Sequence, residues 1–270
     1  MTTPLLRTVN LAKTFPLSRS GSHSSAQITA FQDVNLEIRA GSTMALVGRS
    51  GSGKSTLALC LALFESPSSG EIYFEGASTV RAESVALRML RSQIQLIFQD
   101  PSTALNPRLT AIEVVAEPLT IAGVAKTERR DRALAIMERV GLASSAANRR
   151  SSEFSGGQKQ RLAIARALLL KPKLLILDEA FSALDLSLQV QMCDLLRALQ
   201  SERGLTYLHI THDFDLVERV ADEVAVLAEG RIVDFGPTSR VLKNPAHVCT
   251  EQLIAATPRM PDWYVAGAAS

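Results

Sequence analysis

The sequence has few cysteines and no long apolar run. Its three cysteines, Cys60, Cys193 and Cys249, lie far apart and form no CxxC pair. This excludes the spacing of a disulfide framework or a zinc site and favours a reducing cytosol. The longest apolar runs, residues 57–64 and 163–170, are well short of the roughly 20 residues needed to span a bilayer. We therefore expect a chain that does not cross a membrane itself.

An excess of charge of one sign is also missing. The 29 Lys+Arg residues against 27 Asp+Glu give a formal net charge of +2, too balanced for a main partner that is bulk nucleic acid or an acidic membrane. Residues 1–20 contain no apolar stretch of signal-peptide length, which favours a cytoplasmic location. With 46% hydrophobic residues among 270, the chain can bury a large core in one or two compact units.

Strand-like and helix-like segments alternate along the chain, which favours an α/β fold with a largely parallel sheet covered by helices. Short apolar runs predict buried strands at residues 42–47, 174–177 and 207–210, and a hairpin over 224–234. Residues 99–161 have a mainly helical pattern, with Pro101, Pro107 and Pro118 expected as breaks. Residues 16–29, rich in Ser and Gly, are expected to form an exposed loop.

A glycine-rich segment carries the firmest chemistry. Gly48 to Ser55 matches GxxxxGK[ST], in which backbone N–H groups curl around phosphate oxygens and the next helix points its positive end at them. Lys54 would reach the β- and γ-phosphates, Ser55 would ligate Mg²⁺, and Thr56 would lie near the α-phosphate. A glycine turn before a buried helix is the alternative, but the strand-then-helix context favours the phosphate loop. The residues expected to bind nucleotide here are Gly48, Ser50, Gly51, Gly53, Lys54, Ser55 and Thr56.

Two acidic residues follow the apolar run 174–177. Asp178 should therefore stand at the carboxyl end of a buried strand, where open α/β sheets bind ligands. We expect Asp178 to hold Mg²⁺ through a water and Glu179 to polarise the water that attacks the phosphate. The alternative is that this acidic pair only caps the next helix.

The segment Phe154 to Gln158 supports two interpretations. Ser155 and Gln158 have the spacing of a capping box at the start of a helix. Gly156 and Gly157 weaken a helix by about 1 kcal/mol each, yet they leave the backbone bare for close approach to an anion. An exposed helix N-terminus that meets an anion fits the whole segment better.

Taken in order, five segments resemble those of the ATP-binding subunit of an ABC transporter. They are Gly48–Thr56, Gln99, Phe154–Gln158, Leu174–Glu179 and Thr211–His212, and the resemblance runs from about Leu5 to about Pro258. It implies a P-loop NTPase (RecA-like) core with a mainly parallel sheet, a small antiparallel β subdomain and an inserted α-helical subdomain. The implied boundaries are 1–98 and 166–243 for the core, 99–165 for the helical subdomain with the signature motif, and 244–270 for a C-terminal extension.

The resemblance also implies roles for single residues. Ser155, Gly156, Gly157 and Gln158 would form the signature motif that caps the γ-phosphate held by a partner subunit, and Phe154 replaces the usual Leu. Asp185, in the segment 182–185, would cross that interface, although a surface helix cap is an equal alternative.

Three further roles follow from the same resemblance. His212 would touch the γ-phosphate, while His23, His209 and His247 are expected to be structural or solvated. Gln99 would contact Mg²⁺ and the attacking water. Phe15 would stack on adenine, with an ordinary core phenylalanine as the alternative.

The subfamily and the partners follow from resemblance as well. Residues 99–108 look like the extended loop of dipeptide, oligopeptide and nickel importer ATPases, and residues 244–258 look like their C-terminal extension. This implies ATP and Mg²⁺ as ligands, a second ATPase subunit in a homo- or heterodimer, two transmembrane permeases and, indirectly, a solute-binding protein. The chain would then be peripheral, at the cytoplasmic face of the inner or plasma membrane.

The sequence departs from the importer subfamily at two places, and two other functions remain as alternatives. Glu179-Ala180-Phe181 and Val248-Cys249-Thr250 depart from the usual subfamily sequences. The first of these, together with Gly48-Arg49-Ser50, resembles nickel importers slightly more. One rival is a soluble, non-transport ABC ATPase. The other is a regulatory module without turnover, against which Lys54, Asp178, Glu179 and His212 argue.

Overall fold

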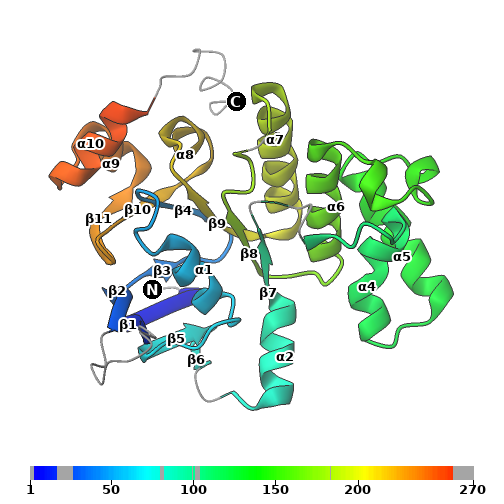
Figure 1. Ribbon diagram of the computed structural model, residues 1–270, viewed down its shortest axis with the longest axis horizontal. Coiled ribbons are helices and arrows are strands. Elements are labelled where there is room, and N and C mark those ends of the chain that lie inside the picture. The colour runs from blue at the N-terminus through cyan, green and yellow to red at the C-terminus, as the bar shows by residue number, and fades with distance from the viewer. Residues whose placement is uncertain are drawn as a thin grey trace, which may run out of the picture. The chain divides into compact units, whose positions relative to one another are not determined.

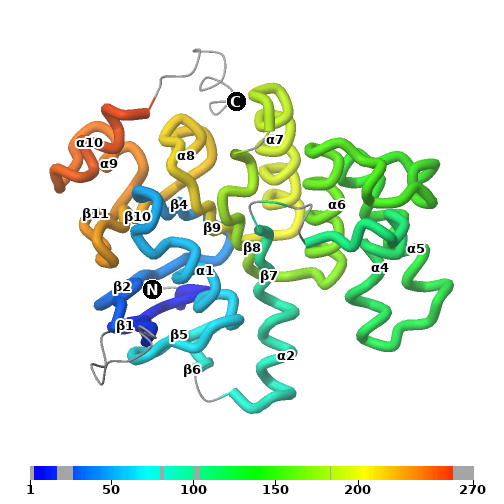
Figure 2. Tube along the Cα trace, viewed as in Figure 1, coloured from blue at the N-terminus to red at the C-terminus, as the bar shows by residue number. Residues whose placement is uncertain are grey.

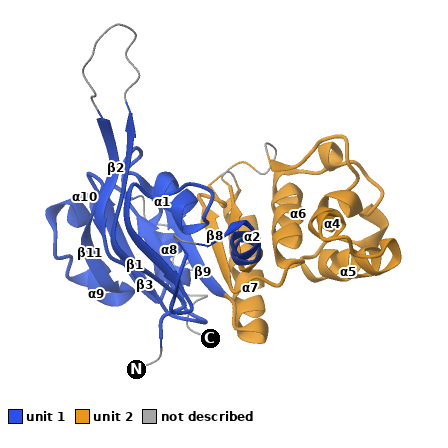
Figure 3. Cartoon of the chain, turned by 90° about the horizontal axis from the view of Figure 1, so that it is seen from below, with its two compact units in different colours: residues 1–91, 206–270 blue, residues 92–205 orange. Residues whose placement is uncertain are grey.

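The computed structural model describes residues 3–16, 27–79, 82–98, 100, 104–182 and 184–257. The chain divides into two compact units, one of residues 1–91 and 206–270 and the other of residues 92–205 (Figure 3). These bounds are not the domain boundaries expected from the sequence, which stay a prediction. Helix α2 (Ser84–Gln93) contains the residues at which the first division falls.

The first unit contains an antiparallel sheet in the order β2-β1-β5-β6, with β3 also paired to β1 (Figure 1). Its strands are β1 (Leu6–Pro16), β2 (Gln27–Val34), β3 (Glu37–Ile38), β5 (Ser69–Phe74) and β6 (Ala77–Ser78). The loop expected at residues 16–29 is shorter than predicted, because Pro16 pairs with Gln27 and Phe15 with Ile28. The β-forming side chains of Phe15 and Ile28 extend the hairpin into a segment whose Ser and Gly content favoured a loop.

A second sheet contains the parallel strands of this unit. Strand β4 (Thr43–Val47) pairs in parallel with β9 (Thr206–Thr211) and with β10 (Glu223–Ala228). Every residue of β4 and β9 is buried, which explains why neither strand shows the polar–apolar alternation of a half-exposed strand. Strand β11 (Arg231–Pro237) closes the predicted antiparallel hairpin with β10.

Helices α1 (Lys54–Leu61) and α8 (Phe214–Val220) follow β4 and β9, and α9 (Thr238–Lys243) and α10 (Val248–Ala256) follow the hairpin. One core cluster joins Ala45 and Val47 of β4 with side chains of α8, β10 and α9. Leu253 and Ile254 of α10 pack against it. The expected C-terminal segment is therefore part of this core as far as it is described.

A buried carboxylate fixes the start of that segment. Asp234 accepts hydrogen bonds from the Arg240 guanidinium at 2.6 Å and from the Ala246 N–H at 2.7 Å. Burial opposes the charge of Asp234, but these donors outweigh it and hold the pKa of the carboxyl below its ordinary value.

The second unit combines a parallel pair of strands with a group of helices. Strand β7 (Ile94–Ile97) pairs with β8 (Leu174–Asp178). The helices are α4 (Ala111–Ile121), α5 (Lys126–Arg139), α6 (Gly156–Leu168) and α7 (Leu186–Arg203), with 3₁₀ turns at Ser144–Ala146 and Ser151–Glu153. Helices α4, α5 and α6 contact one another, as the tube in Figure 2 shows. The mainly helical pattern predicted for residues 99–161 is confirmed.

The expectation that Pro118 breaks a helix is wrong. Pro118 lies inside α4, which continues to Ile121. A proline at this position removes one N–H from the helical ladder. The apolar residues on either side, Ala116 and Leu119, are buried against the neighbouring helices, and this packing keeps the helix intact.

The helix lengths and the cysteines of the described residues bear on two of the sequence expectations. In the described part of the chain, no helix combines the length and the hydropathy that a bilayer span requires. All three cysteines are free thiols, with Cys60 and Cys193 buried and Cys249 half-buried.

The buried His209 generates a pH prediction. It lies in β9 at 3% exposure, and burial lowers its pKa from 6.5 to about 4. The unfolded chain binds this proton more readily, so stability is lost as the pH falls from 6.5 toward 4, by roughly 2 kcal/mol between pH 7 and pH 5. Urea unfolding at both pH values should show this loss. The free energy of unfolding of the His209→Gln variant should fall by about 2 kcal/mol less between pH 7 and pH 5. An identical difference in the variant would contradict the assignment.

Candidate functional site

The glycine-rich segment connects β4 to α1 and packs too closely for side chains at two positions. A Cβ on Gly48 would lie 2.3 Å from the carbonyl oxygen of Leu227. Gly53, which caps α1, has a φ of 104°, and its Cβ would lie 2.2 Å from the carbonyl oxygen of Ala30. Glycine is therefore required at both ends of the loop by steric contact as well as by backbone conformation.

The N-terminus of α1 fits a polyanion. Within the described residues no side chain caps this helix, and its first turn carries no acidic residue. The first backbone N–H groups are thus open to phosphate oxygens. The buried Ser52 hydroxyl also has no hydrogen-bond partner among the described residues, as expected of a polar group beside a ligand site.

The loop lysine is held by main-chain groups. Lys54 is buried, and its ammonium donates to the carbonyl oxygens of Gly48 at 2.7 Å and of Arg49 at 2.9 Å. Ser55 is exposed and Thr56 is half-buried, on the first turn of α1. The ammonium is thereby fixed at the positive end of the helix, where an anion gains most from both charges.

His212 shares a hollow with this loop. It is exposed directly after β9, and Asp213 caps α8 by accepting from the N–H groups of Asp215 and Leu216. The hollow, of about 440 Å³, is lined by Gly48, Arg49, Ser50, His212, Asp213, Leu253, Ala256 and Thr257. The last three belong to α10 or follow it directly, and the Arg49 guanidinium donates to Gln252 at 3.1 Å. Motif spacing gave no signal that α10 lies beside the glycine loop.

Phe15 stands near the end of β1 with 38% of its surface exposed. An ordinary core phenylalanine would be buried, so the exposed ring fits a stacking role better. The ammonium of Lys13 lies 4.9 Å from the centre of this ring.

In the second unit, Asp178 is the last residue of β8 and Glu179 follows it directly. Asp178 is buried, whereas Glu179 is half-buried and has a left-handed backbone with a φ of 46°. Both the N–H and the hydroxyl of Ser182 donate to the Glu179 carbonyl, at 3.1 and 2.9 Å. A non-glycine residue pays roughly 1–2 kcal/mol for this conformation, which is typical of functional sites. The helix-cap alternative is wrong for this pair, because α7 begins at Leu186 and its N-cap is Asp185.

The signature segment begins α6. Ser155 is the N-cap, and the capping box is present: Ser155 Oγ accepts from the Gln158 N–H at 3.4 Å, and Gln158 accepts from the Ser155 N–H at 3.1 Å. A Cβ on Gly156 would meet no described atom within 4 Å. The capping-box interpretation is therefore confirmed, and the space beside Gly156 is open, whereas the role of this helix start in meeting an anion stays a prediction. Phe154 is buried beneath the Arg149 guanidinium.

The segment around Asp185 lies beside the signature helix. A Cβ on Gly157 would be 2.9 Å from the side chain of Leu188, in the first turn of α7. Asp185 is exposed and accepts from the Leu188 N–H at 2.9 Å, so it is a helix cap in this structure. The buried Gln189 donates to the carbonyls of Phe181 and Leu184, which fixes the turn before α7.

Gln99 lies outside the described residues, as do Pro101 to Thr103, Ala183 and Pro258. Of the other predicted site residues, Phe15, the glycine loop and His212 belong to the first unit. Asp178, Glu179, the signature segment and Asp185 belong to the second.

Comparison with known proteins places this chain. Residues 31–182 match the family described as "ABC transporter". The chain is 41% identical over 259 residues to "Dipeptide transport ATP-binding protein DppF" of Haemophilus influenzae, covering 96% of this chain and 79% of that protein. It is 43% identical over 258 residues to "Glutathione import ATP-binding protein GsiA" of Pectobacterium atrosepticum, covering 94% of this chain and 41% of that protein.

A solved structure titled "Dimeric structure of a post-hydrolysis state of the ATP-binding cassette MJ0796 bound to ADP and Pi" has a TM-score of 0.75 and 31% identity to this chain. The structural match covers 86% of this chain and 98% of the chain in that structure. The fold is therefore that of a P-loop NTPase. Together with the family match over more than half of the sequence, this shows that the chain belongs to the ABC transporter family, as an ATP-binding and ATP-hydrolysing subunit.

Proposed function

We propose that this chain is the ATPase subunit of a membrane importer for dipeptides and oligopeptides. The observation that carries the proposal is the 41% identity, over 96% of the chain, to a protein named for dipeptide transport. The sequence of residues 99–108 and of residues 244–258 supports the same subfamily. The packing of α10 against the core supports a structural role for the second of these segments.

The residues of the first unit bind the phosphates and the base of ATP. Backbone N–H groups of the glycine loop and of the first turn of α1 surround the phosphate oxygens, with Lys54 on the β- and γ-phosphates. Phe15 stacks on adenine through its exposed ring. His212, which lines the same hollow as Gly48 and Ser50, contacts the γ-phosphate.

The magnesium ligands are proposed from the resemblance. Ser55 would hold the ion directly, Asp178 would hold it through a water, and Gln99, outside the described residues, would complete the set. The exposed hydroxyl of Ser55 and the carboxylate at the end of a buried strand are oxygen donors of the kind that Mg²⁺ prefers. When bound, the ion supplies positive charge against the phosphate oxygens.

Glu179 accepts a proton from the attacking water. Its left-handed backbone turns the chain sharply at the end of β8, and the two Ser182 donors hold this turn. A base held in a fixed orientation keeps the proton acceptor within hydrogen-bond reach of the nucleophile.

The transport cycle needs partners. A second ATPase subunit is proposed to receive the signature residues Ser155 to Gln158 on its nucleotide, with Asp185 at the interface. Two permeases are the membrane partners, and a solute-binding protein acts through them, so the chain lies at the cytoplasmic face of the membrane as a peripheral subunit. Binding of ATP favours one permease conformation and hydrolysis resets it.

One of the two sequence features that resemble nickel importers, Ala180-Phe181, has a structural explanation. Ala180 and Phe181 are 6% and 2% exposed, so their side chains pack in the interior and cannot contact a transported solute. Their identity reports local packing, and nickel is retained only as an arm of the uptake experiment.

Glu179→Gln should bind ATP with a Kd within about twofold of the wild type. It should hydrolyse ATP at least ~100-fold more slowly, because the variant lacks the general base. Steady-state phosphate release by the assembled transporter, which includes the second ATPase subunit, and equilibrium ATP binding measure the two effects.

Glu229→Gln is the matched control, because Glu229 is exposed and shares the left-handed backbone at a φ of 50°. It should leave turnover unchanged. Full turnover in Glu179→Gln would remove Glu179 from the base role.

Uptake of labelled dipeptide in the source cells should be lost with Lys54→Ala, because the phosphates lose their buried cation. Lys243→Ala, an exposed lysine of α9 outside every motif, is the control and should transport normally. Labelled nickel is measured in parallel. Loss of nickel uptake alone would replace the peptide assignment, and loss of neither would favour a non-transport ABC ATPase.

The second ATPase subunit should be a different chain, as is common in the subfamily that the sequence resembles. With ATP, the purified Glu179→Gln variant should therefore remain monomeric in light scattering. An ATP-dependent homodimer, with full ATPase activity in the wild type, would rule out the heterodimer. A membrane pull-down that recovers no permease would count against the transport role itself.

A further inference from the structure

A buried lysine adjoins the ring proposed to stack on adenine. The side chain of Lys13 is 11% exposed, and its ammonium lies 4.9 Å from the centre of the Phe15 ring, within the range of a cation–π contact. Phe15 keeps 38% of its surface exposed. The ring is thus held by a cation and remains accessible to a base.

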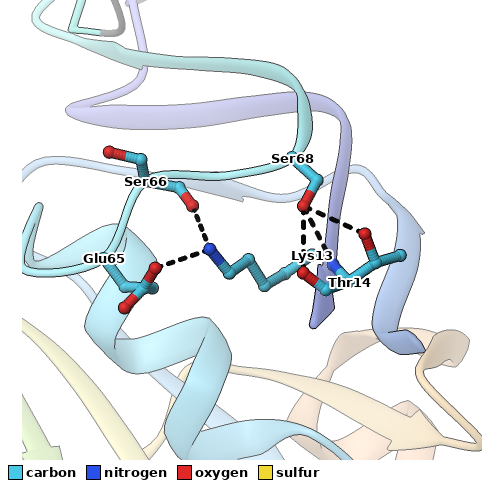
Figure 4. Close-up of polar contacts among 5 residues, drawn as sticks. All are labelled: Lys13, Thr14, Glu65, Ser66 and Ser68. Carbon is cyan, nitrogen blue, oxygen red and sulfur yellow. Dashed lines mark hydrogen bonds and ion pairs between the residues drawn. The ribbon is translucent and has the colours of Figure 1, made fainter. Parts of the chain in front are cut away.

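The same ammonium is anchored to the segment that follows α1. Lys13 Nζ donates to the Glu65 carboxylate at 2.5 Å and to the Ser66 carbonyl oxygen at 2.7 Å (Figure 4). The ammonium therefore contacts Glu65 and Ser66 through its N–H donors and the Phe15 ring through its charge. Since α1 carries the phosphate-binding N–H groups at its N-terminus, Lys13 connects the adenine side of the site to the segment after the phosphate-binding helix.

A second set of contacts holds the neighbouring residue. The Ser68 hydroxyl accepts from the Thr14 N–H at 3.0 Å and from the Thr14 hydroxyl at 3.2 Å (Figure 4). The pairing of β1 with β5 is irregular between Val9 and Ala12 and ends at Ala12 and Ser69. The pairing of β1 with β2 is irregular on both sides of Lys13. Side-chain contacts thus fix the strand where the backbone ladder is interrupted.

The charge beside Lys13 is supplied by Glu65. Cys60 lies close to this pair, but burial raises the pKa of its thiol to about 12, so it stays neutral. Glu65 is partly exposed, whereas the lysine is not. Removing the lysine would therefore leave a carboxylate that water can solvate, which makes a substitution at position 13 tolerable for folding.

We propose that Lys13 is a positioning residue for nucleotide binding, which acts through Phe15 and does not touch the nucleotide. By holding the ring against the segment after α1, it keeps the stacking surface at a fixed spacing from the phosphate loop. The inference rests on the proposed stacking by Phe15. Its specific consequence is that loss of Lys13 weakens binding of the base and leaves binding of the phosphates unchanged.

The test compares ADP with pyrophosphate, each with magnesium, on the full chain by calorimetry with competition. Lys13→Met should raise the Kd of ADP about three- to tenfold, as expected for a lost cation–π and ion-pair anchor. The Kd of pyrophosphate, which has no base to stack, should not change. An equal loss for both ligands would overturn the proposal, because it would show general damage to the phosphate loop.

A double-mutant cycle identifies the route of action. Phe15→Ala should weaken binding of ADP but not of pyrophosphate. Adding Lys13→Met to this variant should cause no further loss of ADP affinity. A further loss of the full size would overturn action through Phe15. If Phe15→Ala leaves ADP binding unchanged, the stacking role fails and the inference with it. If Phe15→Ala weakens binding and Lys13→Met does not, only the inference fails.

Glu65→Gln is the second variant if Lys13→Met does not fold, as judged by circular dichroism. It keeps the lysine and weakens its anchor at a partly exposed position. The Kd of ADP should rise about twofold, with pyrophosphate binding unchanged. No change in ADP binding would overturn the anchoring role of the pair.

Discussion

The close approach of backbone to backbone around the glycine loop is the constraint on which the rest of the site depends. Gly48 and Gly53 each leave no room for a Cβ, at 2.3 and 2.2 Å from carbonyl oxygens of neighbouring strands. This approach lets a fully buried strand end and a helix begin within six residues, with N–H groups at its tip and Lys54 beneath it. The parallel strands and their covering helices supply the rigid frame that this geometry needs.

Much of the fold could be predicted because burial on both faces leaves a plain signal. Strands β4, β8 and β9 are buried along their whole length and show no polar–apolar alternation, and each was expected within one or two residues. Predictions that depended on composition or on one residue type were weaker. Pro118 lies within α4, where packing outweighs one lost hydrogen bond. Pro16, Gln27 and Ile28 lie in the segment expected as a loop but pair as strand residues, because the composition of the whole segment hid the strand propensity at its ends.

In the candidate site, too, features set by consecutive residues were predictable and features set by distant residues were not. Motif spacing predicted the glycine loop, the acidic pair at the end of β8 and the signature segment as site residues, because their backbone and charge requirements are met by consecutive residues. The left-handed backbone of Glu179, the α10 side of the hollow at His212 and the anchoring of Lys13 could not be predicted. Each depends on residues far away, or on a main-chain angle that no pattern of glutamate encodes.

The caps of α6 and α7 have a mechanical consequence. Ser155 and Asp185 satisfy backbone N–H groups of their own helices, Ser155 through a long bond of 3.4 Å. In the proposed dimer, any contact that these side chains make with a neighbouring subunit would compete with the hydrogen bond that each already makes within its own helix. The net free energy gained per contact would then be small. An interface built from such exchanged bonds would separate readily once the nucleotide that bridges it is gone.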